Sequence, residues 1–136
     1  MRLVAGLLGF ALGLTGMAKA FDDQRRIPDL ATMAFEERLG LMLDREVIER
    51  HNKRLGTRLK AAALRQDASV EDVDLRTPRG LDKALFQKLA AGDWIDRHQN
   101  LLICGPAGTG KSWIACALGH KACRDDRAVL YHRCQR

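Results

Sequence analysis

The sequence predicts an α/β fold, in which a helical N-terminal arm leads into the first part of a parallel-sheet domain. Three observations support this fold class. Apolar residues recur at helical spacing in the first half of the chain, a short apolar run at residues 101–104 suits a buried strand, and a glycine-rich turn joins that run to a second helical pattern. A further apolar run at residues 128–132 predicts a second strand. We therefore expect the order helical arm, strand, loop, helix and strand, with the sheet left incomplete at residue 136.

The composition favours a cytosolic protein with an acidic partner. The chain of 136 residues has room for one domain, or for a small domain with an extended arm. Its 23 lysines and arginines outnumber its 17 acidic residues, and the net charge of +6 favours a polyanion such as nucleic acid. The four cysteines include no C-x-x-C pair, so we expect them to be reduced, with Cys116 and Cys123 at buried positions of one helix.

The first 20 residues allow two interpretations. Arg2, the apolar run 3–14 and the small-residue site 18–20 are typical of a cleaved secretory signal, which would place the mature N-terminus at Phe21. The apolar run is shorter than the ~20 residues that span a membrane, so no membrane association is expected. We favour a cytoplasmic helix over export, because the loop described below would use cytosolic ligands. The helix would present an apolar seam of Leu3, Leu7, Phe10, Leu14, Met17 and Phe21.

A polar linker and a long helix are expected next. Residues 21–29 are mostly polar, and Pro28 disfavours a helical conformation at Ile27. Thr32 is a suitable N-cap for the following helix, and two glutamates in its first turn would interact favourably with the helix dipole. The helical spacing of apolar residues then continues from Phe35.

The second half of this helix is strongly basic. Six basic residues and no acidic one occur from residue 50 to residue 65. Such like charges repel one another in an isolated helix, and a polyanion would relieve the repulsion. Because no aromatic residues alternate with the charges, we expect contacts with the backbone of double-stranded DNA, although a solvated face without a partner fits the pattern equally well. The candidate DNA-binding residues are Arg50, Lys53, Arg54, Arg58, Lys60 and Arg65.

A domain boundary is expected near residue 75. Ser69 and Asp72 indicate a capping box, and the segment 70–80 has the composition of a boundary. A short helix is expected from Leu81 to Ala91, and the tryptophan that follows it is expected to be a packing anchor. We therefore divide the chain into a helical, basic arm at residues 1–75 and a second domain at residues 76–136.

The glycine-rich turn fits the phosphate-binding pattern G-x-x-x-x-G-K-[ST], which begins at Gly105 and ends at Ser112. Glycines leave room for backbone N–H groups to surround a phosphate, and the following helix adds the positive end of its dipole. Lys111 would reach the β- and γ-phosphates of a nucleoside triphosphate, and the Ser112 hydroxyl would bind Mg²⁺. The lesser alternative is a glycine-rich turn with an incidental lysine. The candidate nucleotide-binding residues are Gly105, Pro106, Ala107, Gly108, Thr109, Gly110, Lys111, Ser112 and Trp113.

From about Leu14 onward the chain resembles the IstB-like family. These proteins are transposition-helper ATPases of bacterial insertion sequences, related to DnaC-type helicase loaders within the AAA+ class. The resemblance implies that the arm contacts DNA and that residues from about 80 onward begin an AAA+ ATP-binding domain. It also implies that ATP with Mg²⁺ drives self-assembly on DNA and delivery of a transposase. The segments that carry the resemblance are LTGMAKAF, FEERLGLMLDRE, RLKAAALR, VEDVDLRTPRGLD and GPAGTGKSWIACALGHKACR.

The sequence departs from the family pattern after the loop. A Walker B strand, the sensor residues and an arginine finger would follow the loop, and none occurs before Arg136. Asp125 and Asp126 do not replace the Walker B acids, because they follow a helix rather than an apolar strand. We therefore expect ATP binding with little or no hydrolysis, and we assign no catalytic residue. Two alternatives stay open: a DnaC-like helicase loader in replication, and a non-catalytic DNA-binding protein with a vestigial loop.

Overall fold

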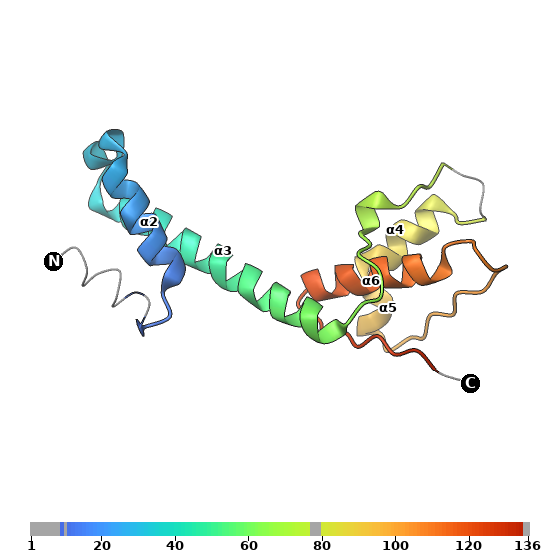
Figure 1. Cartoon of the computed structure of the whole chain (residues 1–136). Helices are drawn as coiled ribbons and strands as arrows, with labels where there is room; N and C mark the ends of the chain where they lie inside the picture. Colours follow the sequence, from blue (N-terminus) through green and yellow to red (C-terminus); the bar gives the residue numbers. More distant parts are fainter. Residues whose placement is uncertain (1–8, 10, 77–79, 135–136) are drawn as a thin grey trace. The chain divides into compact units, whose positions relative to one another are not determined.

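A computed structural model describes residues 9, 11–76 and 80–134 of the chain (Figure 1). These residues belong to two compact units, one ending at Arg54 and the other beginning at Leu55, so the division falls inside the longest helix. The boundary predicted between residues 75 and 76 concerns function and stays a prediction. The helical elements are α2 (Thr15–Arg26), η1 (Pro28–Thr32), α3 (Phe35–Ala62), η2 (Val70–Asp72), α4 (Lys83–Ala91), α5 (Asp93–Asp96) and α6 (Lys111–Arg124).

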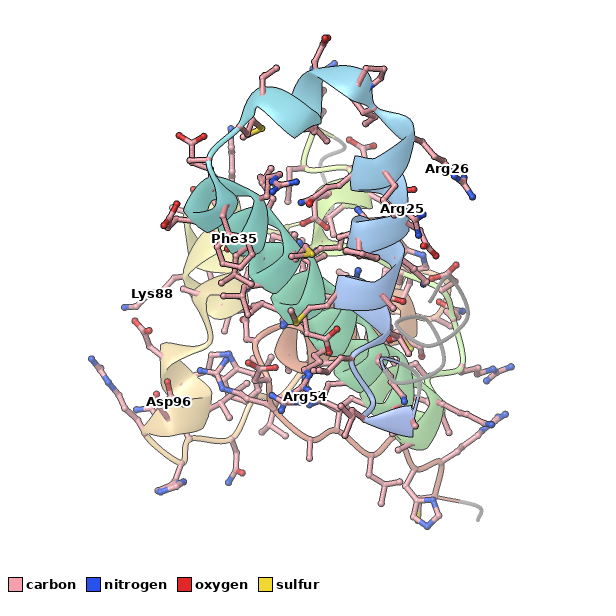
Figure 2. All side chains as sticks on the ribbon, turned by 90° about the vertical axis from the view of Figure 1, so that its left-hand side faces the viewer. Arg25, Arg26, Phe35, Arg54, Lys88 and Asp96 are labelled. Atoms are coloured by element: carbon pink, nitrogen blue, oxygen red, sulfur yellow. The ribbon has the colours of Figure 1, made fainter. Side chains whose placement is uncertain are left out.

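In the first unit, α2 lies along α3 at very close range (Figures 1 and 2). The contact is closest at Gly16, which is buried and has no side chain to separate the two backbones. Glu46 of α3 is only 5% exposed and accepts hydrogen bonds from the backbone N–H groups of Gly16 (2.8 Å) and Met17 (3.0 Å). A carboxylate from α3 therefore satisfies free N–H groups at the N-terminus of α2.

The prediction of a polar linker at residues 21–29 is wrong for most of this segment, because α2 continues to Arg26. One contact with α3 and one contact within α2 involve this segment. The Gln24 amide donates to the Arg38 carbonyl oxygen (2.8 Å), and the Arg25 guanidinium lies 5.8 Å from the centre of the Phe21 ring. The expected effect of Pro28 is confirmed, since the helix ends before it. Leu3, Leu7 and Phe10 of the predicted apolar seam lie outside the described residues, as does the first part of the proposed signal.

The long helix begins at Phe35, so the prediction that Thr32 caps it is wrong. Thr32 instead ends η1, where its hydroxyl donates to the Asp29 carbonyl oxygen (2.6 Å). The two glutamates expected in the first turn of the helix, Glu36 and Glu37, are there. Figure 2 shows Phe35 at the start of α3, where 62% of the residue surface is exposed.

In the second unit, one face of α6 forms the core. Cys116 and Ala117 are fully buried against Ala68. Cys123 is also fully buried, so the predicted burial of both helix cysteines is confirmed, and burial raises the pKa of the Cys123 thiol. Partly buried apolar residues complete the cluster: Leu64, Val70, Val73, Trp113 and Tyr131.

Ion pairs join the elements around α6. Arg124 binds Glu71 of η2 (2.7 Å), and Arg127 binds Asp96 of α5 (2.8 Å). The Arg127 guanidinium also lies against Gly92, the buried C-cap of α4. Segments that are distant in sequence are thereby held to the C-terminal end of α6 and to the residues that follow it.

Two predicted features of residues 69–92 hold in part. Ser69 caps η2, where its hydroxyl accepts from the backbone N–H of Glu71 (3.4 Å), but this is a single turn rather than a capping box with Asp72. The helix expected from Leu81 begins two residues later with an Asp82 N-cap, and it ends at Gly92 in the left-handed conformation. Helix type and C-cap are therefore confirmed.

The strands predicted at residues 101–104 and 128–132 are not formed among the described residues. A strand is stable only when a neighbouring strand takes up its backbone hydrogen bonds, and neither segment has one here. Instead, the Tyr131 N–H donates to the Ala62 carbonyl oxygen at the end of α3 (2.9 Å). Among the described helices, none is both long enough and apolar enough to span a membrane.

Candidate functional site

The glycine-rich loop is exposed and leads directly into α6. Gly105, Gly108 and Gly110 have φ angles of 153°, 81° and 85°, which favour glycine over residues with a side chain. Gly110 is the N-cap of α6, and its carbonyl oxygen accepts from the Ile114 N–H (2.9 Å). The backbone N–H groups of the first turn of α6 have no partner within the helix, so the loop ends at the positive pole of a helix dipole.

Two side chains fold back onto the loop. The Thr109 hydroxyl donates to the Pro106 carbonyl oxygen (3.0 Å), and the Lys111 ammonium donates to the same oxygen. The neighbouring Ser112 is exposed in the first turn of α6, whereas Trp113 is partly buried in the core. The arrangement places a cation, a hydroxyl and a row of N–H donors at one end of α6.

A cavity of about 280 Å³ adjoins the loop at Gly110. Its lining combines apolar residues with two acidic ones, Asp72 and Asp74. Sequence reasoning treated Asp72 only as a capping residue and gave Asp74 no role, because nothing in the local pattern indicates that this segment folds back beside the loop. The remaining lining residues are Val73, Leu81, Trp113 and Ile114.

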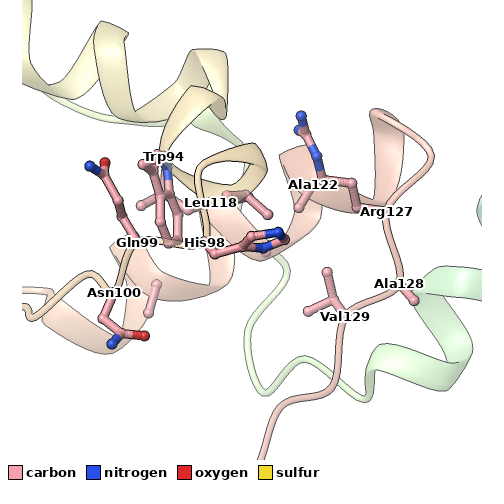
Figure 3. Close-up of a pocket in the computed structure, with 12 residues that line it drawn as sticks. Trp94, His98, Gln99, Asn100, Leu118, Ala122, Arg127, Ala128 and Val129 are labelled. Carbon is pink, nitrogen blue, oxygen red and sulfur yellow. The ribbon is translucent and has the colours of Figure 1, made fainter.

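A larger cavity of about 520 Å³ lies along α6 (Figure 3). Trp94, Leu118 and Ala122 line it, together with Asn100, which precedes the first predicted strand, and Val129, which lies within the second. No residue of the loop 105–112 is among its lining residues. The larger cavity is therefore not the one next to the phosphate-binding pattern.

The basic residues of α3 have different surroundings. Arg50, in the first unit, pairs with Glu46 (2.7 Å), and this bond lowers the pKa of the Glu46 carboxyl against the opposing effect of burial. Arg58, in the second unit, pairs with Asp126 (2.6 Å) next to the C-terminus of α6. Lys53, Arg54 and Lys60 are exposed along α3, and Arg65 is exposed beyond its end.

A glycine-rich loop of this kind at a helix N-terminus is typical of proteins that bind the phosphate groups of nucleotides. Residues 8–136 match the family of IstB-like ATP binding proteins. The chain belongs to this family. Membership implies an α/β fold, as the sequence predicted, although the details of the sheet are not established.

Relatives of the chain are named as ATP-binding proteins of insertion sequences. The y4pL protein of Sinorhizobium fredii is 58% identical over 125 residues, which cover 92% of this chain and 51% of the relative. The y4uH protein of the same organism is 50% identical, covering 90% of this chain and 49% of the relative. The IS1162 protein of Pseudomonas fluorescens is 49% identical, covering 92% and 54%. The chain thus spans about half the length of these curated relatives.

Proposed function

We propose that this chain binds ATP with Mg²⁺ through residues 105–113, and that it does so as part of an ATP-dependent helper of DNA transposition. The observation that carries the proposal is the exposed glycine-rich loop, which ends at the N-terminus of α6 with Lys111 folded over it. The family supports ATP as the nucleotide and an insertion sequence as the setting.

Each loop residue has a role in this proposal. The N–H groups around Gly108 and Gly110 would surround a phosphate, and Lys111 would exchange the Pro106 carbonyl oxygen for phosphate oxygens. Ser112 is exposed, and its hydroxyl would hold Mg²⁺. Bound Mg²⁺ would neutralise part of the phosphate charge. The residues present fit ATP with Mg²⁺, since a hydroxyl and a cationic side chain lie at the N-terminus of one helix.

We further propose that residues 1–75 form the DNA-contacting arm and that residues 76–136 begin the ATP-binding domain. Exposed Arg54, Lys60 and Arg65 are the strongest candidates for contacts with the backbone of double-stranded DNA. Arg50 and Arg58, which pair with carboxylates, would need to share those partners with phosphate. A transposase and further copies of the helper are the proposed protein partners, and the cytoplasm, which supplies ATP, is the proposed compartment.

Calorimetric titration of the purified chain with Mg-ATP tests the central claim. We expect saturable binding that is lost in Lys111→Ala, because the loop then lacks the cation that meets the phosphates. Lys88→Ala is the matched control, since it removes an equally positive side chain, which is exposed on α4. Equal ATP affinity of the wild type and Lys111→Ala would refute the proposal.

DNA binding by the wild type and by Lys111→Ala separates the proposed helper from a passive DNA-binding protein. If ATP drives assembly on DNA, duplex binding falls in Lys111→Ala and in the absence of ATP. If the loop is vestigial, DNA affinity is unchanged in both cases. A steep decrease of affinity with salt is expected in either case, because the proposed contacts are to phosphates.

A further inference from the structure

We propose that Asp126 restrains DNA binding by holding Arg58 at the C-terminal end of α6, so that DNA phosphates must compete with this carboxylate for the guanidinium. The inference rests on the proposed DNA contact and goes beyond it, because it assigns an intramolecular competitor to one of the candidate DNA-binding residues. Such a contact within the chain is autoinhibitory, since it uses a positive charge that DNA would otherwise find available.

The Arg58 guanidinium has two partners in the second unit. Its Nη1 atom lies 2.6 Å from a carboxylate oxygen of Asp126 and donates, at a longer 3.5 Å, to the Cys123 carbonyl oxygen. The last four carbonyl groups of a helix have no partner within the helix, and a cation is favourable at this negative end of the helix dipole. Arg58 therefore binds a carboxylate and the end of α6 at the same time.

The end of α3 is packed against α6, which keeps these groups together (Figure 1). The Leu64 side chain, just beyond α3, lies so close to Gly119 of α6 that an added Cβ atom there would be 3.1 Å from it. The Tyr131 N–H donates to the Ala62 carbonyl oxygen (2.9 Å), which joins the end of α3 to the segment that follows α6. Asp126 lies at the start of that segment. The ion pair is thus part of a packed region of the second unit.

Exposure distinguishes Arg58 from the other candidates in its unit. Only 23% of its side-chain surface is exposed, whereas Lys60 and Arg65 are exposed residues. The Asp126 side chain is 62% exposed, so solvent reaches the ion pair from the carboxylate side. Ion pairs that water can reach contribute little to stability, and phosphate is a strong acceptor for a guanidinium. DNA can therefore compete for Arg58, but only by displacing it from Asp126.

Fluorescence anisotropy of a labelled DNA duplex, at low salt and with Mg-ATP present, tests the restraint in the full chain. The variant is Asp126→Asn, which removes the charge and keeps the size of the side chain. Asparagine also tolerates the φ angle of 64° at this position better than most residues do. We expect the variant to bind the duplex up to about fivefold more tightly than the wild type, because Arg58 no longer has to leave an ion pair.

Two controls separate the release of Arg58 from the general loss of a negative charge. Asp67→Asn removes an equally negative, exposed side chain beyond the end of α3, and it should increase DNA affinity less than Asp126→Asn does. In an Arg58→Gln background, Asp126→Asn should have no larger effect than Asp67→Asn, because no guanidinium is left to release.

A second substitution keeps the test valid if asparagine disturbs the turn. Asp126→Gly removes the same carboxylate, and glycine readily adopts a positive φ angle. Circular dichroism at the helix band identifies variants that are folded, and a folded Asp126→Gly variant should show the same increase in DNA affinity as Asp126→Asn.

The outcomes separate this inference from the function on which it rests. DNA affinity that is unchanged in the folded Asp126 variants, that rises equally in Asp67→Asn, or that still rises in the Arg58→Gln background overturns the restraint while the DNA contact stands. If neither the wild type nor the Asp126 variants bind the duplex at low salt, the proposed DNA contact fails and the inference fails with it.

Discussion

A methyl group added at Gly16 tests the contact between α2 and α3 directly. An ideal Cβ atom at this position would lie 2.7 Å from the Arg45 carbonyl oxygen and 2.7 Å from the Cα atom of Glu46. Both are backbone atoms, so no side-chain rotation can relieve the overlap, and α2 must move away from α3. That movement would also weaken the hydrogen bonds from the N-terminus of α2 to the Glu46 carboxylate.

The expected magnitude follows from two opposing effects. Replacing glycine by alanine inside a helix is worth about 0.5–1 kcal/mol of stabilisation, whereas overpacking a close contact costs about 1–3 kcal/mol. Gly40 of α3 provides the control, since a Cβ atom there would have nothing within 4 Å. The helix effect is common to the two variants, so Gly16→Ala should be less stable than Gly40→Ala by about 1–3 kcal/mol.

Urea unfolding followed by circular dichroism at the helix band measures this difference. We expect Gly40→Ala to unfold at a higher urea concentration than the wild type and Gly16→Ala at a lower one. If Gly16→Ala is stabilised as much as Gly40→Ala, the two helices do not approach as closely as described, and the role of Glu46 as a cap is refuted with it.

Two further predictions concern the second unit. Hydrogen bonds from Ser69 and Arg124 lower the pKa of the Glu71 carboxyl from its ordinary 4.5 to about 2. Because the folded-state pKa is the lower one, Glu71 stabilises the fold above pH 4.5, and this contribution is lost as the pH falls toward 2. In thermal unfolding, the melting temperature of Glu71→Gln should therefore lie below that of the wild type at pH 7 and equal it near pH 2. A difference in melting temperature that is constant with pH would contradict the lowered pKa of Glu71. Gly92→Ala should lower the free energy of unfolding by about 1–3 kcal/mol. The φ angle of 85° at this position is strained for alanine, and a Cβ atom would lie 2.5 Å from the Arg127 guanidinium. A melting temperature unchanged by Gly92→Ala would contradict both the left-handed backbone at this position and the packing of Arg127 against it.

Local sequence signals predicted those elements whose cause is local. The helix after the loop, the C-cap at Gly92 and the break before Pro28 depend on glycine and proline, whose backbone preferences act wherever the residue stands. The burial of Cys116 and Cys123 followed from their common helix face. The loop pattern itself was evident because its chemistry requires particular residues at fixed spacing.

Other features depended on residues far away in the chain. The polar segment 21–26 continues α2, and its hydrogen bond from Gln24 to the Arg38 carbonyl oxygen of α3 is a contact that composition cannot reveal. The apolar segments 101–104 and 128–132 have the sequence of strands, but a strand needs a partner whose presence no local pattern guarantees.

The sequence by itself determined the family and the phosphate-binding loop, because both are encoded in contiguous residues. Tertiary structure alone decided which residues come together across the chain: Glu46 with the N-terminus of α2, and Asp72 and Asp74 with Gly110 in the lining of one cavity. The physical reason is that a side chain's neighbours in space depend on how helices pack. Residues about 30 or 40 positions apart in the sequence come together through that packing, and no sequence spacing predicts which residues they are.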